Sequence, residues 1–209
     1  MIIIRTNHDI QTSYLFKWSN AIIEEAEVRD FIVNKIEGGD ITERNLRGRV
    51  KKRQPSLIFF NGHGSKNSLI NNQKKEFINL DSADVFKGTI AYTRACECLV
   101  ELGPEAVEKG CRSFIGYKKK FWIARQHKWE CNPLLDPVAK PILEGSNVIM
   151  RELLKGKSVD EAVKKSHEHA ARSIRELIYS KEPLASPSLS AIVANDGALD
   201  FEGDASARI

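Results

Sequence analysis

Short apolar runs alternate with segments of helical period along the whole chain. The runs are typical of strands that are buried on both faces of a parallel sheet, and we expect strands at residues 2–4, 30–36, 57–60, 89–93 and 113–117. Apolar positions at helical spacing predict a helix over residues 14–26. A later helix is expected to begin at Ser158, which forms a capping box with Glu161.

Capping and turn residues predict the remaining elements. Asp40 and Glu43 resemble a helix-opening pair. Pro104 and Gly110 bracket a short helix, in the preferred order of proline first and glycine last. Residues 118–133 show no clear period, so we expect a long loop, and long loops in compact domains are often functional.

The end of the chain is expected to form a hairpin of residues 191–194 and 198–201, joined by the turn Asn195-Asp196-Gly197. With the alternation described above, this order predicts a doubly wound α/β sandwich. Its central sheet would hold about six mainly parallel strands, with helices on both faces. The length suits a single domain over residues 1–209.

Composition narrows the class of protein. Hydrophobic residues make up 42% and charged residues 29% of the chain, which is typical of a globular protein. The first residues lack the features of a secretory signal. The four cysteines are therefore expected to stay reduced, and the expected location is cytoplasmic, without a membrane segment.

The net charge of +4 is too weak to predict a nucleic-acid partner. Basic residues cluster between positions 44 and 53. We interpret this cluster as a solvated helix end whose cations face the negative pole of the helix dipole. No nucleic acid is expected among the partners.

Two residues with catalytic chemistry follow predicted strands. His63 comes after the strand at 57–60, and Cys96 comes after the strand at 89–93. Loops from the carboxyl ends of parallel strands converge at one edge of the sheet, and a thiol needs a nearby base to act as a nucleophile at neutral pH. The Gly64 amide could join the Cys96 amide in binding an oxyanion.

The run Phe59-Phe60-Asn61-Gly62-His63-Gly64-Ser65, followed 33 residues after the histidine by Ala95-Cys96, resembles the caspase-like (clan CD) cysteine peptidases. This clan includes caspases, metacaspases, clostripain, gingipains, separase and bacterial CHAT proteases. The resemblance implies a caspase-like fold and a cysteine endopeptidase with His63 as base and Cys96 as nucleophile. It implies a protein or peptide substrate and requires neither a metal nor an organic cofactor.

Three further residues are candidates for substrate binding. Arg94 should share a strand face with Cys96, because residues two apart project to the same side. In the family this position helps to select the residue before the cleaved bond, and a buried arginine suits a carboxylate. We therefore hypothesise cleavage after Asp or Glu, unless Arg94 pairs with an internal carboxylate such as Glu97 or Asp84. Trp122 and Trp129, in the long loop, are expected to border the substrate groove or simply to pack on the domain.

Other interpretations remain open at this stage. The chain could be a catalytically silent caspase-like module that binds a protein partner, since a fold does not fix a function. Control by a separate regulatory protein is also open. Zinc binding by Cys96 and Cys98 is not expected, because residues two apart in a strand do not aim at one tetrahedral ion. Cys98, Cys111 and Cys131 are interpreted as structural.

Overall fold

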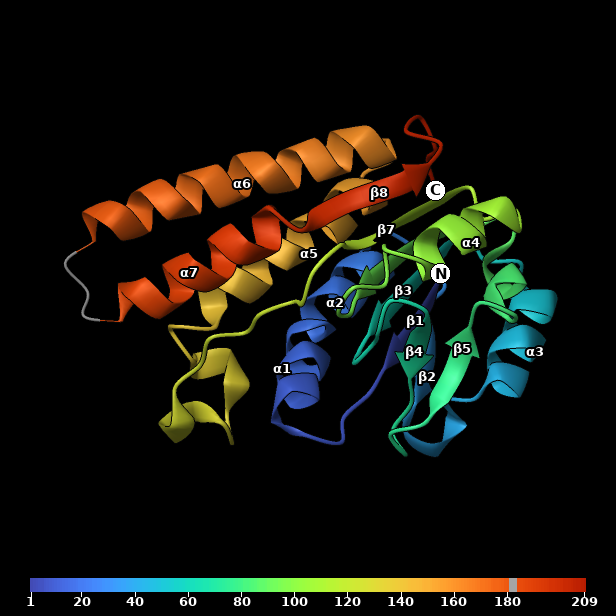
Figure 1. The fold of residues 1–209 in the computed structure, drawn as a ribbon, viewed down its shortest axis with the longest axis horizontal. Helices are drawn as coiled ribbons and strands as arrows, with labels where there is room; N and C mark the ends of the chain where they lie inside the picture. The colour runs from blue at the N-terminus through green and yellow to red at the C-terminus, as the bar shows by residue number, and fades with distance from the viewer. Residues whose placement is uncertain (181–183) are drawn as a thin grey trace.

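A computed structural model describes residues 1–180 and 184–209. Its centre is a six-stranded sheet in the order β2-β1-β3-β6-β7-β8 (Figure 1). The first five strands of this order run parallel and β8 is antiparallel to β7. The strands are β1 (Ile2–Arg5), β2 (Asn34–Glu37), β3 (Leu57–Asn61), β6 (Ile90–Arg94), β7 (Ser113–Tyr117) and β8 (Leu199–Gly203).

Alternate residues of each strand enter two separate cores, because successive side chains point to opposite faces of the sheet. Ile3 and Phe59 belong to the core under three helices: α2 (Asn20–Val28), α5 (Lys140–Leu154) and α6 (Val159–Tyr179). Ile4 and Phe60 belong to the opposite core. That core lies under α3 (Glu43–Arg53), α4 (Leu102–Glu108), the 3₁₀ turn η2 (Ala83–Phe86) and a hairpin of β4 (Ser68–Ile70) with β5 (Glu76–Asn79).

The predicted fold class is confirmed: the sheet is mainly parallel and helices cover both faces. The Ser158 capping box is also present, with the hydroxyl accepting from the Glu161 amide and the Glu161 carboxylate accepting from the Ser158 amide. The strands expected at 57–60, 89–93 and 113–117 form within one residue of those bounds. The long loop at 118–133 forms as expected, with 3₁₀ turns η3 (His127–Trp129) and η4 (Pro133–Leu135).

Two predicted helix boundaries were wrong. The helix expected over 14–26 is two helices, α1 (Ile10–Trp18) and α2, which meet at Ser19. The Ser19 hydroxyl donates to the Phe16 carbonyl and accepts from Arg5, and side-chain bonds of this kind compete with helix continuation. Asp40 lies in the 3₁₀ turn η1 (Gly38–Asp40), and the helix α3 is capped instead by Thr42, which accepts from the Asn45 amide.

The predicted terminal hairpin was also wrong. Residues 191–194 lie in the helix α7 (Ala185–Asp196), and β8 pairs with β7 rather than with its own neighbour in sequence. Ala191 and Ile192 pack with Ile142 of α5 and Ala170 of α6, so this apolar run belongs to a helix interface. A short apolar run alone does not distinguish a strand from a buried helix.

The strand expected at 30–36 shrinks to β2, because Asp30 has a left-handed backbone (φ 63°) that forms a turn after α2. The β4–β5 hairpin was not predicted. Its strands are short, and β5 begins in polar residues that carry little strand signal.

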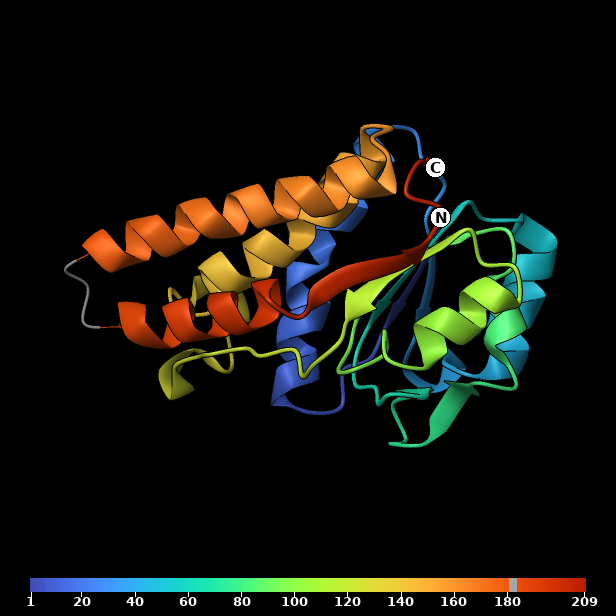
Figure 2. The same cartoon turned by 45° about the horizontal axis from the view of Figure 1, so that its top comes forward.

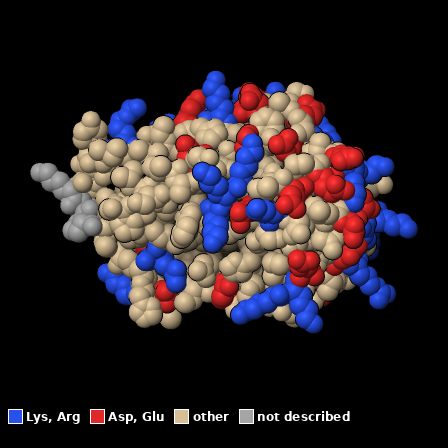
Figure 3. Space-filling model, viewed as in Figure 1, with Lys and Arg blue, Asp and Glu red and all other residues tan. Residues whose placement is uncertain are grey.

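The helices α5, α6 and α7 pack together and extend beyond the sheet on one side, as Figures 1 and 2 both show. On the face in Figure 3, acidic and basic side chains gather to the right, and the left part, toward α6 and α7, is mostly free of them. Among residues 1–180 and 184–209, none of the helices has both the length and the apolar character needed to cross a membrane.

Candidate active site

Three neighbouring strands end together at one edge of the sheet. Arg5, Asn61 and Arg94, the last residues of β1, β3 and β6, are paired side by side in register. The loops that leave these strands carry Asp9, His63 and Cys96. The parallel topology therefore gathers residues from three distant parts of the sequence at the place where open α/β sheets bind ligands.

His63 is bound to a carboxylate that the sequence analysis did not identify. The His63 Nε2 atom lies 2.6 Å from Asp9 Oδ2. Asp9 is the N-cap of α1, and its Oδ1 accepts from the Thr12 amide at 2.8 Å and from the Thr12 hydroxyl at 2.9 Å. The capping box thus fixes one carboxylate oxygen and leaves the other for the histidine.

The carboxylate of Asp9 selects the tautomer of His63. Burial disfavours the charged carboxylate, but hydrogen bonds from Thr12 and His63 outweigh burial and hold the pKa of Asp9 below its usual value. Asp9 is therefore an acceptor at neutral pH, so the His63 Nε2 atom carries a proton and donates to it. In the neutral ring, Nδ1 is then left as the acceptor.

Cys96 is half-buried and borders the same cavity as His63. Burial raises the pKa of its thiol above the usual value, although a hydrogen bond from the Phe121 backbone opposes this effect. The thiol is consequently protonated at neutral pH and needs a base. Within the described residues no hydrogen bond joins the thiol to His63, an arrangement often found before a substrate draws such groups together.

The neighbouring thiol of Cys98 has a packing role. It is fully buried, and its Sγ lies 3.4 Å from the Cys96 carbonyl and 3.9 Å from the Ser68 carbonyl. Burial raises its pKa well above the usual value. Its sulfur fills the space beside Gly64, where an added Cβ would lie only 2.5 Å from Sγ. Of these two thiols, Cys96 is the one that reaches the cavity.

The turn after Cys96 has a left-handed residue, Glu97, with φ 56°. Its amide donates to the Lys119 carbonyl, and its own carbonyl accepts from the Val100 amide. This turn leads the chain away from β6 and leaves Cys96 at the cavity rim. Left-handed backbone favours glycine, so the position tolerates the glutamate rather than requiring it.

The Gly64 amide is one of two candidate oxyanion donors. The loop around it is held by two backbone bonds, from Ser65 to Ser68 and from Ile70 to His63. In the described part of the chain, the amides of Gly64 and Cys96 donate to no acceptor. Gly62 lines the cavity, whereas Gly64 packs under it against Cys98 and Ala95.

A cavity of about 250 Å³ lies beside the thiol. Four of the residues expected in the site line it together: His63, Arg94, Cys96 and Trp122. Trp129 is not one of its lining residues in the described chain. The cavity is completed by side chains of the α1 region and of the long loop, namely Gln11, Leu15, Lys120, Phe121, Ile123 and Arg125, with Gly62 and Ala95.

Arg94 lies at this cavity with its charge unpaired by any carboxylate among the described residues. Its side chain is fully buried and donates to three side-chain oxygens and, at a longer distance of 3.4 Å, to the Leu15 carbonyl. The three side-chain acceptors are Asn61 Oδ1 (2.5 Å), Ser146 Oγ (3.0 Å) and Asn147 Oδ1 (2.9 Å). All these partners are neutral. Burial lowers its pKa to about 10, so the side chain remains cationic at neutral pH.

Neither acidic residue considered as an internal partner reaches Arg94. Asp84 pairs with Arg47 at 2.7 Å on the surface. Glu97 lies in the turn after Cys96 and is not among the partners of Arg94 in the described chain. Arg125, another cation of the cavity wall, is paired with Glu130 at 3.0 Å. None of the described residues that line the cavity is acidic.

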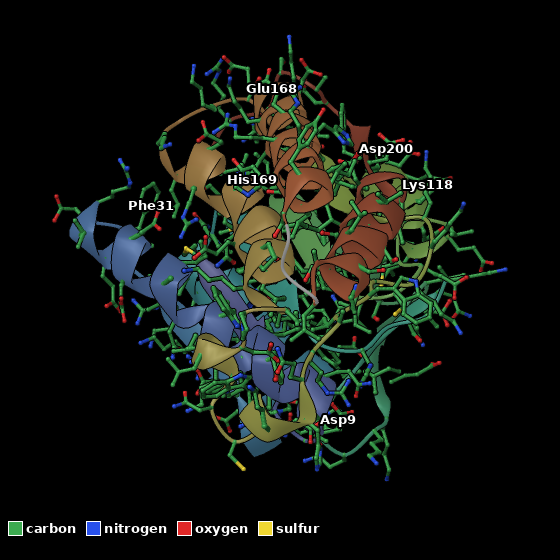
Figure 4. The ribbon with its side chains drawn as sticks, turned by 90° about the vertical axis from the view of Figure 1, so that its left-hand side faces the viewer. Asp9, Phe31, Lys118, Glu168, His169 and Asp200 are labelled. Carbon is green, nitrogen blue, oxygen red and sulfur yellow. The ribbon has the colours of Figure 1, made fainter. Side chains whose placement is uncertain are left out.

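The sequence contains part of the information that places Asp9 in the site. The pattern of Asp9 followed three residues later by Thr12 marks a helix start after the first strand. Strand order was the missing information, since β1 lies next to β3 and so brings this helix start beside His63. His169, by contrast, lies on α6 well away from Asp9, and the exposed ion pair of Lys118 with Asp200 lies on another part of the surface (Figure 4).

Comparison with solved structures found the same fold in a known peptidase. Gingipain R (RgpB), described as an Arg-specific cysteine proteinase, superposes with a TM-score of 0.64 at 12% identity, over 98% of this chain and 46% of that chain. A complex of the Porphyromonas gingivalis RgpB pro- and mature domains gives 0.62 at 11% identity, over 98% of this chain and 47% of that one.

This chain therefore spans less than half the length of either gingipain structure. At these identities the likeness shows the fold, which is the caspase-like α/β fold of the gingipains. No family model matches the sequence, and no curated protein sequence matches it.

Proposed function

We propose that this protein is a cysteine endopeptidase that cleaves protein or peptide substrates. One observation carries the proposal: an Asp9-bound His63 and the Cys96 thiol border a single cavity at the carboxyl edge of a caspase-like sheet. A nucleophile, a base and a group that orients the base are the parts that acyl transfer requires. The gingipain fold supports the same conclusion.

The proposed mechanism follows from the protonation of His63. As Cys96 Sγ attacks the peptide carbonyl carbon, the thiol proton passes to His63 Nδ1, and Asp9 stabilises the imidazolium that forms. The carbonyl oxygen becomes an oxyanion that the free amides of Gly64 and Cys96 would bind. His63 then gives its proton to the leaving amine, and water hydrolyses the remaining thioester. These steps use no metal or organic cofactor.

The proposed specificity is for an acidic residue before the cleaved bond. Arg94 is a buried cation beside the nucleophile, and its partners are all neutral. A guanidinium has five N–H donors and Arg94 uses four, so Nη2 keeps one donor for a ligand. A substrate carboxylate would supply the missing countercharge, whereas lysine or arginine would bring a second cation into a dry site.

Lys120 strengthens this preference, since it is an exposed cation on the cavity wall. Gingipain R is described as Arg-specific, and we expect this chain to differ from it for the reason just given. Trp122, which is 55% exposed and lines the cavity, would contact the substrate next to the cleaved residue.

The test is a peptide-library cleavage profile with matched variants. We expect Cys96→Ala and His63→Ala to abolish cleavage, and Cys98→Ser and Cys111→Ser to retain most of it. A thiol-reactive peptide electrophile should label Cys96 in a His63-dependent way. Folded protein that neither cleaves any peptide nor shows this labelling would instead be a silent interaction module. The cytoplasmic location and a regulatory protein partner stay predictions.

A further inference from the structure

A second histidine faces the carboxylate that orients the base. His8 Nε2 lies 3.6 Å from Asp9 Oδ2, the same oxygen that His63 Nε2 approaches at 2.6 Å. The two imidazole rings meet edge to face, with centroids 5.5 Å apart. One ligand atom from each of His8, Asp9 and His63 lies within 4.8 Å of the other two. The mechanism above uses two of these residues and leaves His8 without a role.

His8 is also poorly satisfied in the free protein. Its side chain is only 8% exposed, and its Nδ1 atom is buried without a hydrogen-bond partner among the described residues. Its Nε2 is beyond hydrogen-bond distance of Asp9. An ion bound between His8 and Asp9 would lie at Nε2, and it would join this nitrogen to a carboxylate that is too far away for a direct hydrogen bond.

We propose that His8, Asp9 and His63 form a site for a divalent transition-metal ion, best suited to zinc, and that the bound ion switches the peptidase off. The inhibitory part rests on the proposed function. Two imidazole nitrogens and one carboxylate oxygen form a ligand set that binds zinc better than it binds calcium or magnesium. Three protein ligands leave a fourth tetrahedral position for water.

The distances suit this ion after a small adjustment. Zinc bonds of about 2.0 to 2.2 Å place neighbouring ligand atoms of a tetrahedron roughly 3.3 Å apart. The two contacts of Asp9 Oδ2, at 2.6 Å and 3.6 Å, bracket that value. Thr12 holds the other oxygen of Asp9 and so fixes the orientation of the carboxylate, which is the role of an outer-shell partner in a metal site.

Inhibition follows from the position of the proton on His63. With Nε2 donating to Asp9, Nδ1 is free to accept the thiol proton from Cys96. An ion bound at Nε2 needs the lone pair of that nitrogen. The proton of the neutral ring must then sit on Nδ1. His63 can no longer act as a base, although Cys96 does not bind the ion. Zinc removal by a chelator should therefore restore activity completely.

The first experiment measures zinc binding without any need for activity. Zinc is titrated into the Cys96→Ala, Cys131→Ser protein, which lacks the nucleophile and the exposed thiol, and into the same protein carrying His8→Phe. We expect one bound ion in the former and at least about tenfold weaker binding in the latter. His127→Gln, which alters a histidine that is 96% exposed, should leave binding unchanged. Binding that vanishes with Cys96→Ala, or that survives His8→Phe unchanged, would overturn the proposal.

The second experiment measures peptide cleavage against zinc concentration in the Cys131→Ser protein with and without His8→Phe. We expect His8→Phe to retain cleavage and to need at least about tenfold more zinc for half inhibition. Equal zinc sensitivity of the two proteins would overturn the inhibitory role. If no cleavage is found in either protein, the proposed function has failed, and the binding result still decides whether the metal site exists.

Discussion

Arg5 and Arg94 both end parallel strands of the sheet and both are buried, but their partners differ. Arg5 donates to the Glu37 carboxylate, to the Phe16 carbonyl at 3.2 Å and to side-chain oxygens of Ser19 and Asn20. Its guanidinium also stacks over the Phe16 ring at 4.0 Å. Arg94 has a comparable set of hydrogen bonds, but all of them are to neutral groups.

We interpret the charge of Arg5 as structural and the charge of Arg94 as available to a ligand. The charge of Arg5 is balanced within the fold, and that arginine ties β1 to β2 and to the junction of α1 and α2. Arg94 lines the cavity beside Cys96, and none of its described partners carries a negative charge. Keeping such a charge buried costs stability, and in the proposed function a carboxylate of the substrate would offset that cost.

The largest expected effect is on substrate choice at Arg94. In Arg94→Met we expect the ratio of kcat/KM for peptides cleaved after Asp to that for peptides cleaved after Ala to fall by about 100-fold or more, because a desolvated carboxylate loses its charged partner. The ratio is measured on one preparation, so partial unfolding cancels. An unchanged ratio would remove Arg94 from the specificity pocket.

The matched change at the other arginine should act on stability. Arg5→Met is expected to lower the free energy of unfolding by about 2 to 3 kcal/mol, because it leaves several buried acceptors without a donor. The specificity ratio should stay as in the unaltered protein. Denaturant titration measures the first quantity, and a shift of specificity in this variant would show that the two arginines are not distinct in role.

Asp9 provides a third charge at the same edge. In Asp9→Asn an amide can donate to His63 Nε2 and favour the wrong tautomer, so we expect kcat to fall by roughly 100-fold or more. Helix capping should survive, since asparagine is an equally good N-cap. A kcat within twofold of the unaltered protein, at equal stability, would contradict the role given to Asp9.

The same variant predicts a pH dependence of stability. The pKa of Asp9 is below its usual value, so the ionised carboxylate stabilises the fold at every pH above the usual Asp pKa of about 3.9. That contribution is lost as the pH falls through the lowered pKa. The difference in unfolding free energy between the unaltered protein and Asp9→Asn should thus shrink as the pH falls below about pH 4.

The smallest effects are expected at the two tryptophans of the long loop. Trp122→Ala should change kcat/KM several-fold with little change in Tm, because the side chain is exposed at the cavity. Trp129→Phe should leave kcat/KM unchanged and keep or slightly raise Tm, because it removes a buried indole N–H without a partner. Equal effects of both changes on cleavage would place Trp129 in the groove as well.

The sequence predicted the parts of this fold that depend on local pattern. Apolar runs gave the central strands, and the order of strand and helix gave the α/β class. His63 and Cys96 were expected at one edge of the sheet because the ends of parallel strands meet there, and both line one cavity at that edge. The terminal hairpin failed because the run at 191–194 packs against helices far away in sequence.

The remaining features of the site depend on which strands are neighbours. Asp9 reaches His63 because β1 lies beside β3, and Arg94 meets Ser146 and Asn147 because α5 crosses beneath β6. No short pattern in the sequence predicts either contact. The orphaned ring nitrogen of His8 likewise becomes visible only when the surrounding side chains are in place.

The close contact between Gly64 and Cys98 has a mechanical consequence. The Cys98 sulfur and the Ala95 methyl group occupy the space where a side chain at position 64 would lie, so only glycine lets the loop after β3 approach the loop after β6 this closely. Among the described residues, no hydrogen bond between His63 and Cys96 sets their spacing. The sulfur of Cys98 lies between the two loops at this point. A methyl group added at position 64 would push these loops apart and, in the proposed mechanism, lengthen the path of the proton from Cys96 to His63.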